Sequence, residues 1–278
     1  APNSVRQVNV APFIEDVSHH PAVPGPRDLV LVRARLSDDL SSPIRGVVHH
    51  RVSSLTPTPF ASTVMRDDGT GGDEVAHDNI YTAVLPAQPE GATVEFYLEA
   101  FDRIQSRTWP AAAHENGLQE ANLLYQVDSE QPAGEAPFYR FILSAGELEE
   151  FLKIPFDSPE RNTNARFNAT FIANVDGKTT TRYQCALRLR GSGTRSRYPR
   201  NLKIELPSST PWKGRDELNL NVQFSYNQLL GSMFYRAAGL PAYESRAVAV
   251  RLNGVNHASP ENASVSRPFN HHFGFYVQ

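Results

Sequence analysis

Residues 93–100 alternate strictly between apolar and polar side chains. A period of two puts successive side chains on opposite faces of a strand, so the segment predicts a β-strand with one buried and one wet face. Residues 29–36, 46–53 and 80–85 predict further strands, separated by turns rich in Pro, Gly and Asp. The chain has 21 prolines and 17 glycines, which favours short strands over long helices.

This spacing, with no helical pattern between the strands, predicts that the chain starts with a β-sandwich of the immunoglobulin or fibronectin type III kind. The segment 128–134 has the composition of a linker. A chain of 278 residues is long enough for two domains that each bury a core. We therefore expect a sandwich over residues 1–135 and a second domain over residues 136–278.

The second domain mixes strand and helix patterns, so we expect an α+β arrangement in a mainly β chain. Ser144 and Glu147 form a capping-box pattern that opens a short helix ending at Lys153. The turn Asp176-Gly177 predicts a hairpin. A longer helix is expected from Ser225 until Gly239 stops it. Further strands are expected at residues 138–143, 165–174, 181–190, 201–206, 247–252 and 272–277.

The bulk charge and hydropathy pattern exclude some partners. The formal net charge of -3 gives no global field that would recruit nucleic acid. No run of about 18 apolar residues is present, so no membrane-spanning segment is expected. We expect the partners to be other proteins, with docking on a membrane complex left open.

The densest candidate site is a basic hairpin, defined as residues 188–203. It carries six cations and no acid around a glycine-containing turn. Glycines allow backbone N–H groups to approach an anion, and arginine suits phosphate oxygens. The alternative is a solvated or interface-pairing hairpin. The candidate anion or nucleotide ligands are Arg190, Gly191, Gly193, Arg195, Arg200 and Lys203.

Several ordered motifs carry a family resemblance. The run from Arg190 to Arg197, followed by Pro199-Arg200-Asn201-Leu202-Lys203, resembles the signature of the CotH (spore coat protein H) kinase-like family. The segments 212–214, 218–221, 238–241 and 250–254 are similar to that family in the expected order. The resemblance implies a β-rich kinase N-lobe, preceded here by an immunoglobulin-like domain, and implies Lys203 or Arg200 as a cation facing nucleotide phosphates.

The same resemblance bears on whether this chain is expected to catalyse phosphoryl transfer. Phosphoryl transfer needs acids that hold the metal and orient the acceptor hydroxyl. The family places them beyond the Asn253-Gly254 motif, where Glu261 is the last acid of this sequence. We therefore expect the lobe to stop before any catalytic lobe and the chain not to transfer phosphate. ATP and magnesium are expected only if it belongs to a longer kinase.

A second candidate site is the acidic loop that contains Asp67, Asp68, Asp73 and Asp78. Carboxylates clustered around glycines can wrap a hard cation such as calcium. The spacing does not match an EF-hand loop, and the alternative is a turn whose Asp side chains cap their own backbone.

Three functions remain open from the sequence. The first is a non-catalytic structural or interaction protein of the cell exterior or bacterial periplasm, in which the chain is a subunit docked on a larger assembly. The expected extracytoplasmic location is implied by the family resemblance and by the Ala-Pro-Asn start, which both a mature secreted end and a trimmed chain would show. The second is the N-terminal part of a secreted CotH-type kinase, and the third is a calcium-dependent adhesion module.

Overall fold

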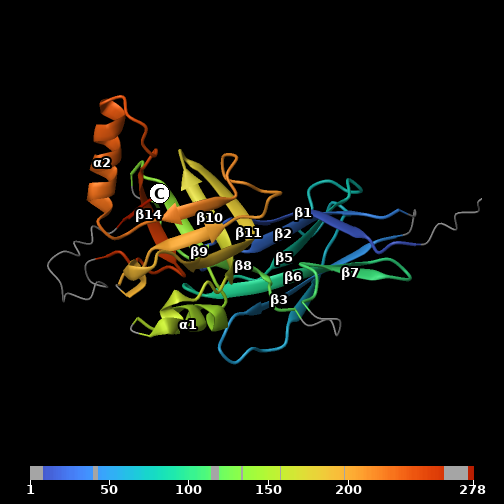
Figure 1. Ribbon diagram of the computed structural model, residues 1–278. Coiled ribbons are helices and arrows are strands. Elements are labelled where there is room, and N and C mark those ends of the chain that lie inside the picture. Colours follow the sequence, from blue (N-terminus) through green and yellow to red (C-terminus); the bar gives the residue numbers. More distant parts are fainter. Residues whose placement is uncertain are drawn as a thin grey trace, which may run out of the picture.

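The computed structural model describes residues 9–39, 43–113, 119–132, 134–156, 158–196, 198–259 and 275–278. Over these residues the protein is mainly β, with its strands arranged in three sheets (Figure 1). Within the described ranges, no helix is both long and apolar enough to cross a membrane.

The N-terminal part contains two of the sheets. The three-stranded sheet has the order β1 (Phe13–His20), β2 (Val30–Ser37) and β5 (Ile80–Leu85). The other sheet has the order β4 (Ala61–Val64), β3 (Arg45–Val52), β6 (Thr93–Phe101) and β7 (Ser106–Trp109), and β8 (Leu123–Gln126) also pairs with β6. All of these strand pairs are antiparallel.

One apolar core joins these two sheets. Val32 and Leu36 of β2 belong to the same buried cluster as Phe96 and Leu98 of β6. The two sheets therefore pack face to face. The buried face that the alternation over residues 93–100 predicted is confirmed, but the predicted wet face is not fully exposed. On that face Glu95 is buried and pairs with Arg51 at 2.8 Å.

A seven-stranded sheet dominates the second part. Its order is β13 (Glu217–Leu220), β12 (Leu202–Glu205), β11 (Lys178–Leu189), β10 (Phe167–Val175), β9 (Phe138–Ile142), β14 (Ala247–Leu252) and β15 (Tyr276–Val277). The first five strands in sequence form an antiparallel meander, and the predicted Asp176-Gly177 turn joins β10 to β11. β14 pairs with β9 in parallel, so the chain crosses over between β13 and β14.

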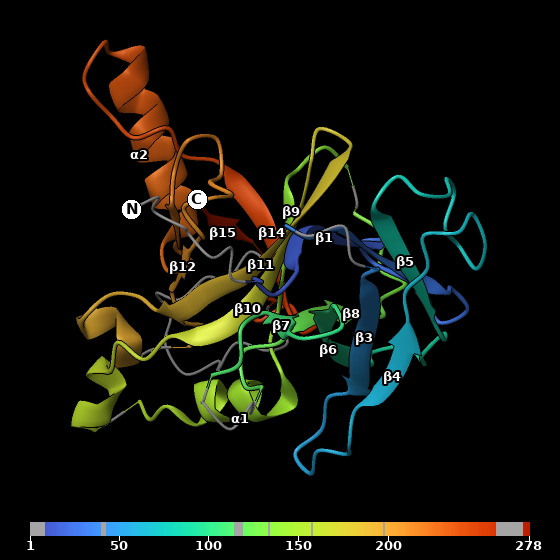
Figure 2. The same cartoon turned by 90° about the vertical axis from the view of Figure 1, so that its right-hand side faces the viewer.

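Two α-helices and two 3₁₀ turns accompany this sheet: α1 (Ala145–Lys153), α2 (Ser225–Ala237), η1 (Pro159–Asn162) and η2 (Gly193–Ser196). The predicted cap of α1 is confirmed, because the Ser144 side chain accepts a hydrogen bond from the Glu147 backbone N–H. α1 buries Phe151 against the sheet. α2 lies in the crossover, contacts β15 and extends outward at the edge of the molecule (Figures 1 and 2).

The two parts touch along β8 and β9–β11. Leu124 packs with Ile142 and Ile172 in a small buried cluster. The hydroxyl of Thr170 accepts a hydrogen bond from the Leu124 backbone N–H at 3.1 Å. Segments far apart in sequence are therefore held by a buried contact between the sheets.

Candidate functional site

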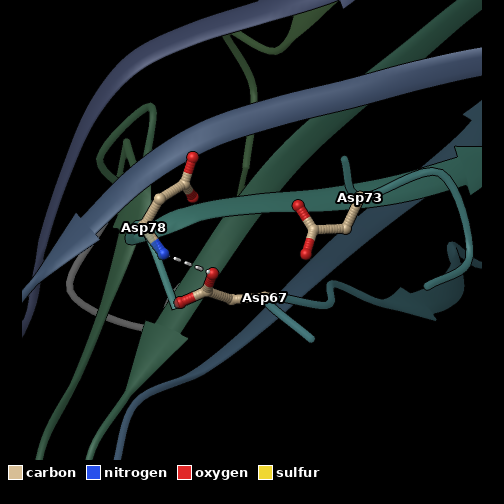
Figure 3. Close-up of side chains that lie close together, drawn as sticks. All are labelled: Asp67, Asp73 and Asp78. Atoms are coloured by element: carbon tan, nitrogen blue, oxygen red, sulfur yellow. Dashed lines mark hydrogen bonds between the residues drawn. The ribbon is translucent and has the colours of Figure 1, made fainter. Parts of the chain in front are cut away.

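The acidic loop connects β4 to β5 and brings three of its carboxylates together. Asp67, Asp73 and Asp78 each offer one oxygen, and these oxygens lie within 4.8 Å of one another (Figure 3). Asp73 is buried, and the other two are partly exposed. We refer to these three residues as the Asp cluster.

Backbone hydrogen bonds hold each carboxylate of the Asp cluster in place. Asp67 accepts from the backbone N–H of Asp78 at 3.1 Å, and Asp73 accepts from that of Gly69 at 2.7 Å. Asp78 accepts from the backbone N–H of Ile80 at 2.9 Å. No Arg or Lys within the described ranges forms a salt bridge with these three residues.

Glycines make this loop geometry accessible. Gly72 has φ +95° and packs so closely that an added Cβ would lie 2.8 Å from the Val84 side chain. An L-residue at this position would be strained in backbone and would collide with β5. The turn is closed by a hydrogen bond from the Asp73 backbone N–H to the Thr70 carbonyl at 3.1 Å, and it leads directly into the buried Asp73.

Asp68 lies outside the Asp cluster. Its carboxylate accepts hydrogen bonds from the hydroxyl and the backbone N–H of Thr70, and it pairs with Arg66 at 3.3 Å. The Thr70 hydroxyl is the main reason that the pKa of Asp68 is lowered. The structure thus divides the four predicted ligands into three that converge and one that caps its own turn.

The buried arginines of the basic hairpin are bound by backbone oxygens. Arg195 donates to the carbonyls of Thr163 at 2.5 Å and Leu189 at 3.2 Å. Arg200 donates to the carbonyl of Ile154, and its guanidinium lies 3.8 Å from the centre of the Phe156 ring.

The outward-facing cations of the hairpin have protein partners too. Lys203 pairs with Glu217. Arg188 pairs with Glu205 at 3.1 Å. Arg190 donates to the side-chain oxygen of Asn221 at 2.5 Å. The six predicted anion ligands therefore lie on one hairpin, but the described cations among them are engaged by protein groups. Arg197 lies outside the described residues.

Gly191 and Gly193 differ sharply in their surroundings. Gly191 has φ +97°, and a Cβ there would lie 2.0 Å from the Thr194 hydroxyl. Gly193 has open space around it. One of the two predicted glycines is therefore required by the turn, and the other is not.

The sequence predicts α2 as a helix but does not predict that the helix is exposed. Its apolar side chains recur at helical spacing, a pattern typical of a buried face. Yet Ser225 is the one buried residue of this helix. No sequence signal distinguishes an apolar stripe that faces the core from one that faces solvent.

Comparisons with known proteins show no family. No family model matches the chain, and no curated protein matches it. Two solved structures are similar over part of their length: a cycloalternan-forming enzyme from Listeria monocytogenes, solved with a pentasaccharide substrate, and an uncharacterised protein from Listeria monocytogenes, solved with glucose, magnesium and calcium. For the cycloalternan-forming enzyme, the sequence identity is 9% and the TM-score is 0.29, and 77% of this chain covers 17% of the enzyme. For the uncharacterised protein, the sequence identity is 8% and the TM-score is 0.29, and 71% of this chain covers 18% of that protein. It thus spans less than a fifth of either protein, and likenesses this distant carry no argument about its function.

Proposed function

We propose that the protein is a non-catalytic structural protein of the cell exterior that assembles with a second copy of itself through α2. In this proposal the N-terminal part is an immunoglobulin-like sandwich and the second part is a CotH-like lobe. The order of motifs from Arg190 to Gly254 supports the family, and the mainly β fold is compatible with it. The observation that carries the proposal is the exposed apolar surface on α2.

Large apolar side chains are exposed on α2 and just after it. Leu230 (47% exposed), Met233 (61%) and Phe234 (70%) are three and four residues apart, so they share one side of the helix. Tyr235 (57%) lies on another side, and Leu240 (51%) and Tyr243 (90%) follow the end of the helix. We call these six residues the α2 surface. Exposed apolar side chains that cluster mark interaction sites, whereas those scattered singly are ordinary.

The charge of the α2 surface suits a second copy. From residue 225 to residue 245 the only ionisable acid and base side chains are Glu244 and Arg236, one of each sign apart from the tyrosines. The partner must therefore be apolar and close to neutral over the same area, and an identical α2 surface meets both conditions. Two copies related by a twofold axis would bury the same patch on both sides.

A groove beside α2 offers space for a side chain of the second copy. It lies between the helix and the returning chain, is lined by Gly231, Tyr235 and Tyr243, and has a volume of about 410 Å³. Gly231 has no atoms within 4 Å of the position that a Cβ would take. An aromatic side chain from another copy, such as Phe234, can enter this space.

Sedimentation of the purified chain at concentrations up to about 100 μM tests this proposal. We expect a dimer for the wild type and a monomer for Met233→Glu with Phe234→Glu. The matched control is Ile104→Glu, because Ile104 is 75% exposed and lies in the N-terminal part. A wild-type monomer at 100 μM, chosen as about a hundred times a micromolar dissociation constant, would refute the proposal, as would equal dissociation by the control.

The nucleotide-binding alternative has less support. Its candidate cations are held by carbonyls, amides and carboxylates of the protein itself. An ATP phosphate would have to displace those partners, and each charge-assisted hydrogen bond lost would offset part of the gain.

The geometry of the Asp cluster supports a second proposal, that the acidic loop binds calcium. Three carboxylate oxygens within 4.8 Å of one another concentrate negative charge that a bound cation would neutralise. Calcium takes six to eight oxygen ligands in flexible geometry, and Asp67, Asp73 and Asp78 would supply the charged ones. A calcium titration followed by thermal unfolding tests this proposal.

A further inference from the structure

A small pocket lies in the second part, between α1, β12, β14 and β15. Its walls are mostly apolar and include Phe151, Leu202, Val250 and Leu252. Its volume of about 40 Å³ has room for about three water-sized groups. The polar side chains that line it are Tyr198, Arg200 and His257.

Arg200 gives the pocket a buried positive charge with an unused donor. The residue is only 8% exposed. One terminal nitrogen donates to the Ile154 carbonyl, but the Nε–H is buried and has no acceptor. No acid within the described ranges forms a salt bridge with it. A buried donor without a partner costs free energy that a ligand oxygen would recover.

The pair of Tyr198 and His257 gives the pocket a second donor. The Tyr198 hydroxyl lies within hydrogen-bond distance of His257 Nδ1. Burial lowers the pKa of His257, so the ring is neutral at pH 7. When the hydroxyl donates to Nδ1, the ring proton lies on Nε2. The polar side of the pocket therefore offers N–H donors and a positive charge, while the rest of its wall is apolar.

We propose that this pocket binds a short-chain monocarboxylate of the size of acetate or propionate, with its carboxylate on Arg200 and His257 and its methyl or ethyl group against the apolar wall. A carboxylate supplies the acceptors that the two donors need and balances the Arg200 charge. An apolar body replaces water on Phe151, Val250 and Leu252, which is favourable in proportion to the area covered. The pocket is too small for a nucleotide. This inference is independent of the association through α2.

Titration calorimetry with acetate and propionate tests the ligand class. We expect binding of at least one of them with a millimolar or lower dissociation constant, and at least tenfold weaker binding of the matching neutral amide. Ethylamine, which is of similar size and carries the opposite charge, is expected not to bind. Failure of both carboxylates to bind would overturn the inference, and so would an amide that binds as tightly as its carboxylate.

Two variants locate the binding in this pocket. Val255 lines the pocket and is 45% exposed, so Val255→Phe fills the pocket mouth with little effect on the core. Its matched control is Val64→Phe, at 49% exposure on β4. We expect at least tenfold weaker propionate binding for Val255→Phe and no change for Val64→Phe. Arg200→Gln should weaken propionate binding at least tenfold if it folds. Equal affinities for the wild type and Val255→Phe would place the binding elsewhere and refute the inference.

Discussion

The hydroxyl of Tyr183 on β11 lies 2.5 Å from Nδ1 of His19 on β1. This contact joins the seven-stranded sheet to the three-stranded sheet, and both residues are buried in the N-terminal core. The His19 ring also stacks on Tyr125 with 5.3 Å between ring centres, and its Nε2 lies 2.9 Å from the Ala22 carbonyl. Both ring nitrogens therefore have partners in the neutral state of the histidine.

The first prediction concerns how stability depends on pH through His19. Burial lowers its pKa from 6.5 to about 4. Above pH 6.5 the ring is neutral in the folded and unfolded chains alike. Between pH 6.5 and pH 4 only the unfolded chain takes up this proton, so the free energy of unfolding falls by about 3 kcal/mol from this residue alone.

Urea unfolding at pH 7.0, 5.5 and 4.5 measures this dependence. His19→Gln is expected to lower stability at every pH but to flatten the slope, since the titrating group is gone. His77 is exposed and belongs to the acidic loop, so His77→Gln should keep the wild-type slope. An unchanged slope in His19→Gln would show that other groups carry the dependence.

A second prediction separates the two glycines of the basic hairpin. Gly191→Ala must hold an L-residue at φ +97° and bring its Cβ to 2.0 Å from the Thr194 hydroxyl. We expect it to lower the free energy of unfolding by about 2 kcal/mol. Gly193→Ala, in open space, should change it by less than about 0.5 kcal/mol. Chemical denaturation of both variants measures the difference, and equal losses would contradict this account of the turn.

Local sequence signals predicted much of the fold correctly. The cap at Ser144 and the turn at Asp176-Gly177 are short-range devices, so they could be recognised without tertiary context. The strand over residues 93–100 was predicted by its alternation. The parallel pairing of β14 with β9 was not predicted, because it joins segments more than 100 residues apart and depends on the whole sheet.

The candidate sites were less predictable because side-chain partners are set by tertiary packing. Asp67 and Asp68 are neighbours in sequence, but the first points into the Asp cluster and the second toward Thr70. Arg195 was expected to face an anion, but it is buried against the Thr163 carbonyl. The sequence pattern also does not predict that Phe234 is exposed, because the burial of a helical residue depends on what packs against the helix.

The third prediction tests calcium in the acidic loop. If the Asp cluster binds calcium, the ion stabilises the folded chain by mass action, about 1.4 kcal/mol at ten times the dissociation constant. For a chain of this size that raises the melting temperature by about 4 °C. Asp73→Asn should abolish the rise, because it removes the buried charge of the cluster. Asp68→Asn should keep it, because Asp68 lies outside the cluster. A rise that survives in Asp73→Asn, or no rise in the wild type at millimolar calcium, would contradict the site.

The last prediction concerns Glu147, whose pKa is raised mainly by burial to about 7. One carboxylate oxygen accepts from the Asn168 backbone N–H at 2.7 Å, and the other accepts from the Ser144 hydroxyl at 3.2 Å. Below pH 4.5 the carboxyl is protonated in both states. As the pH rises from 4.5 through 7, the unfolded chain loses this proton first, so the free energy of unfolding falls by about 2–3 kcal/mol.

This trend opposes that of His19, which favours the folded chain at higher pH. Glu147→Gln keeps an oxygen for Asn168 and removes the buried charge. We therefore expect the variant to match the wild type at pH 4.5 and to exceed its free energy of unfolding at pH 8 by about 2 kcal/mol. Glu149→Gln on the same helix is the control, because Glu149 forms an exposed pair with Lys153 and should leave the pH profile unchanged. Urea unfolding at the two pH values measures both variants. If Glu147→Gln is less stable than the wild type at pH 8, the carboxylate is stabilising the start of α1 and its pKa cannot be raised.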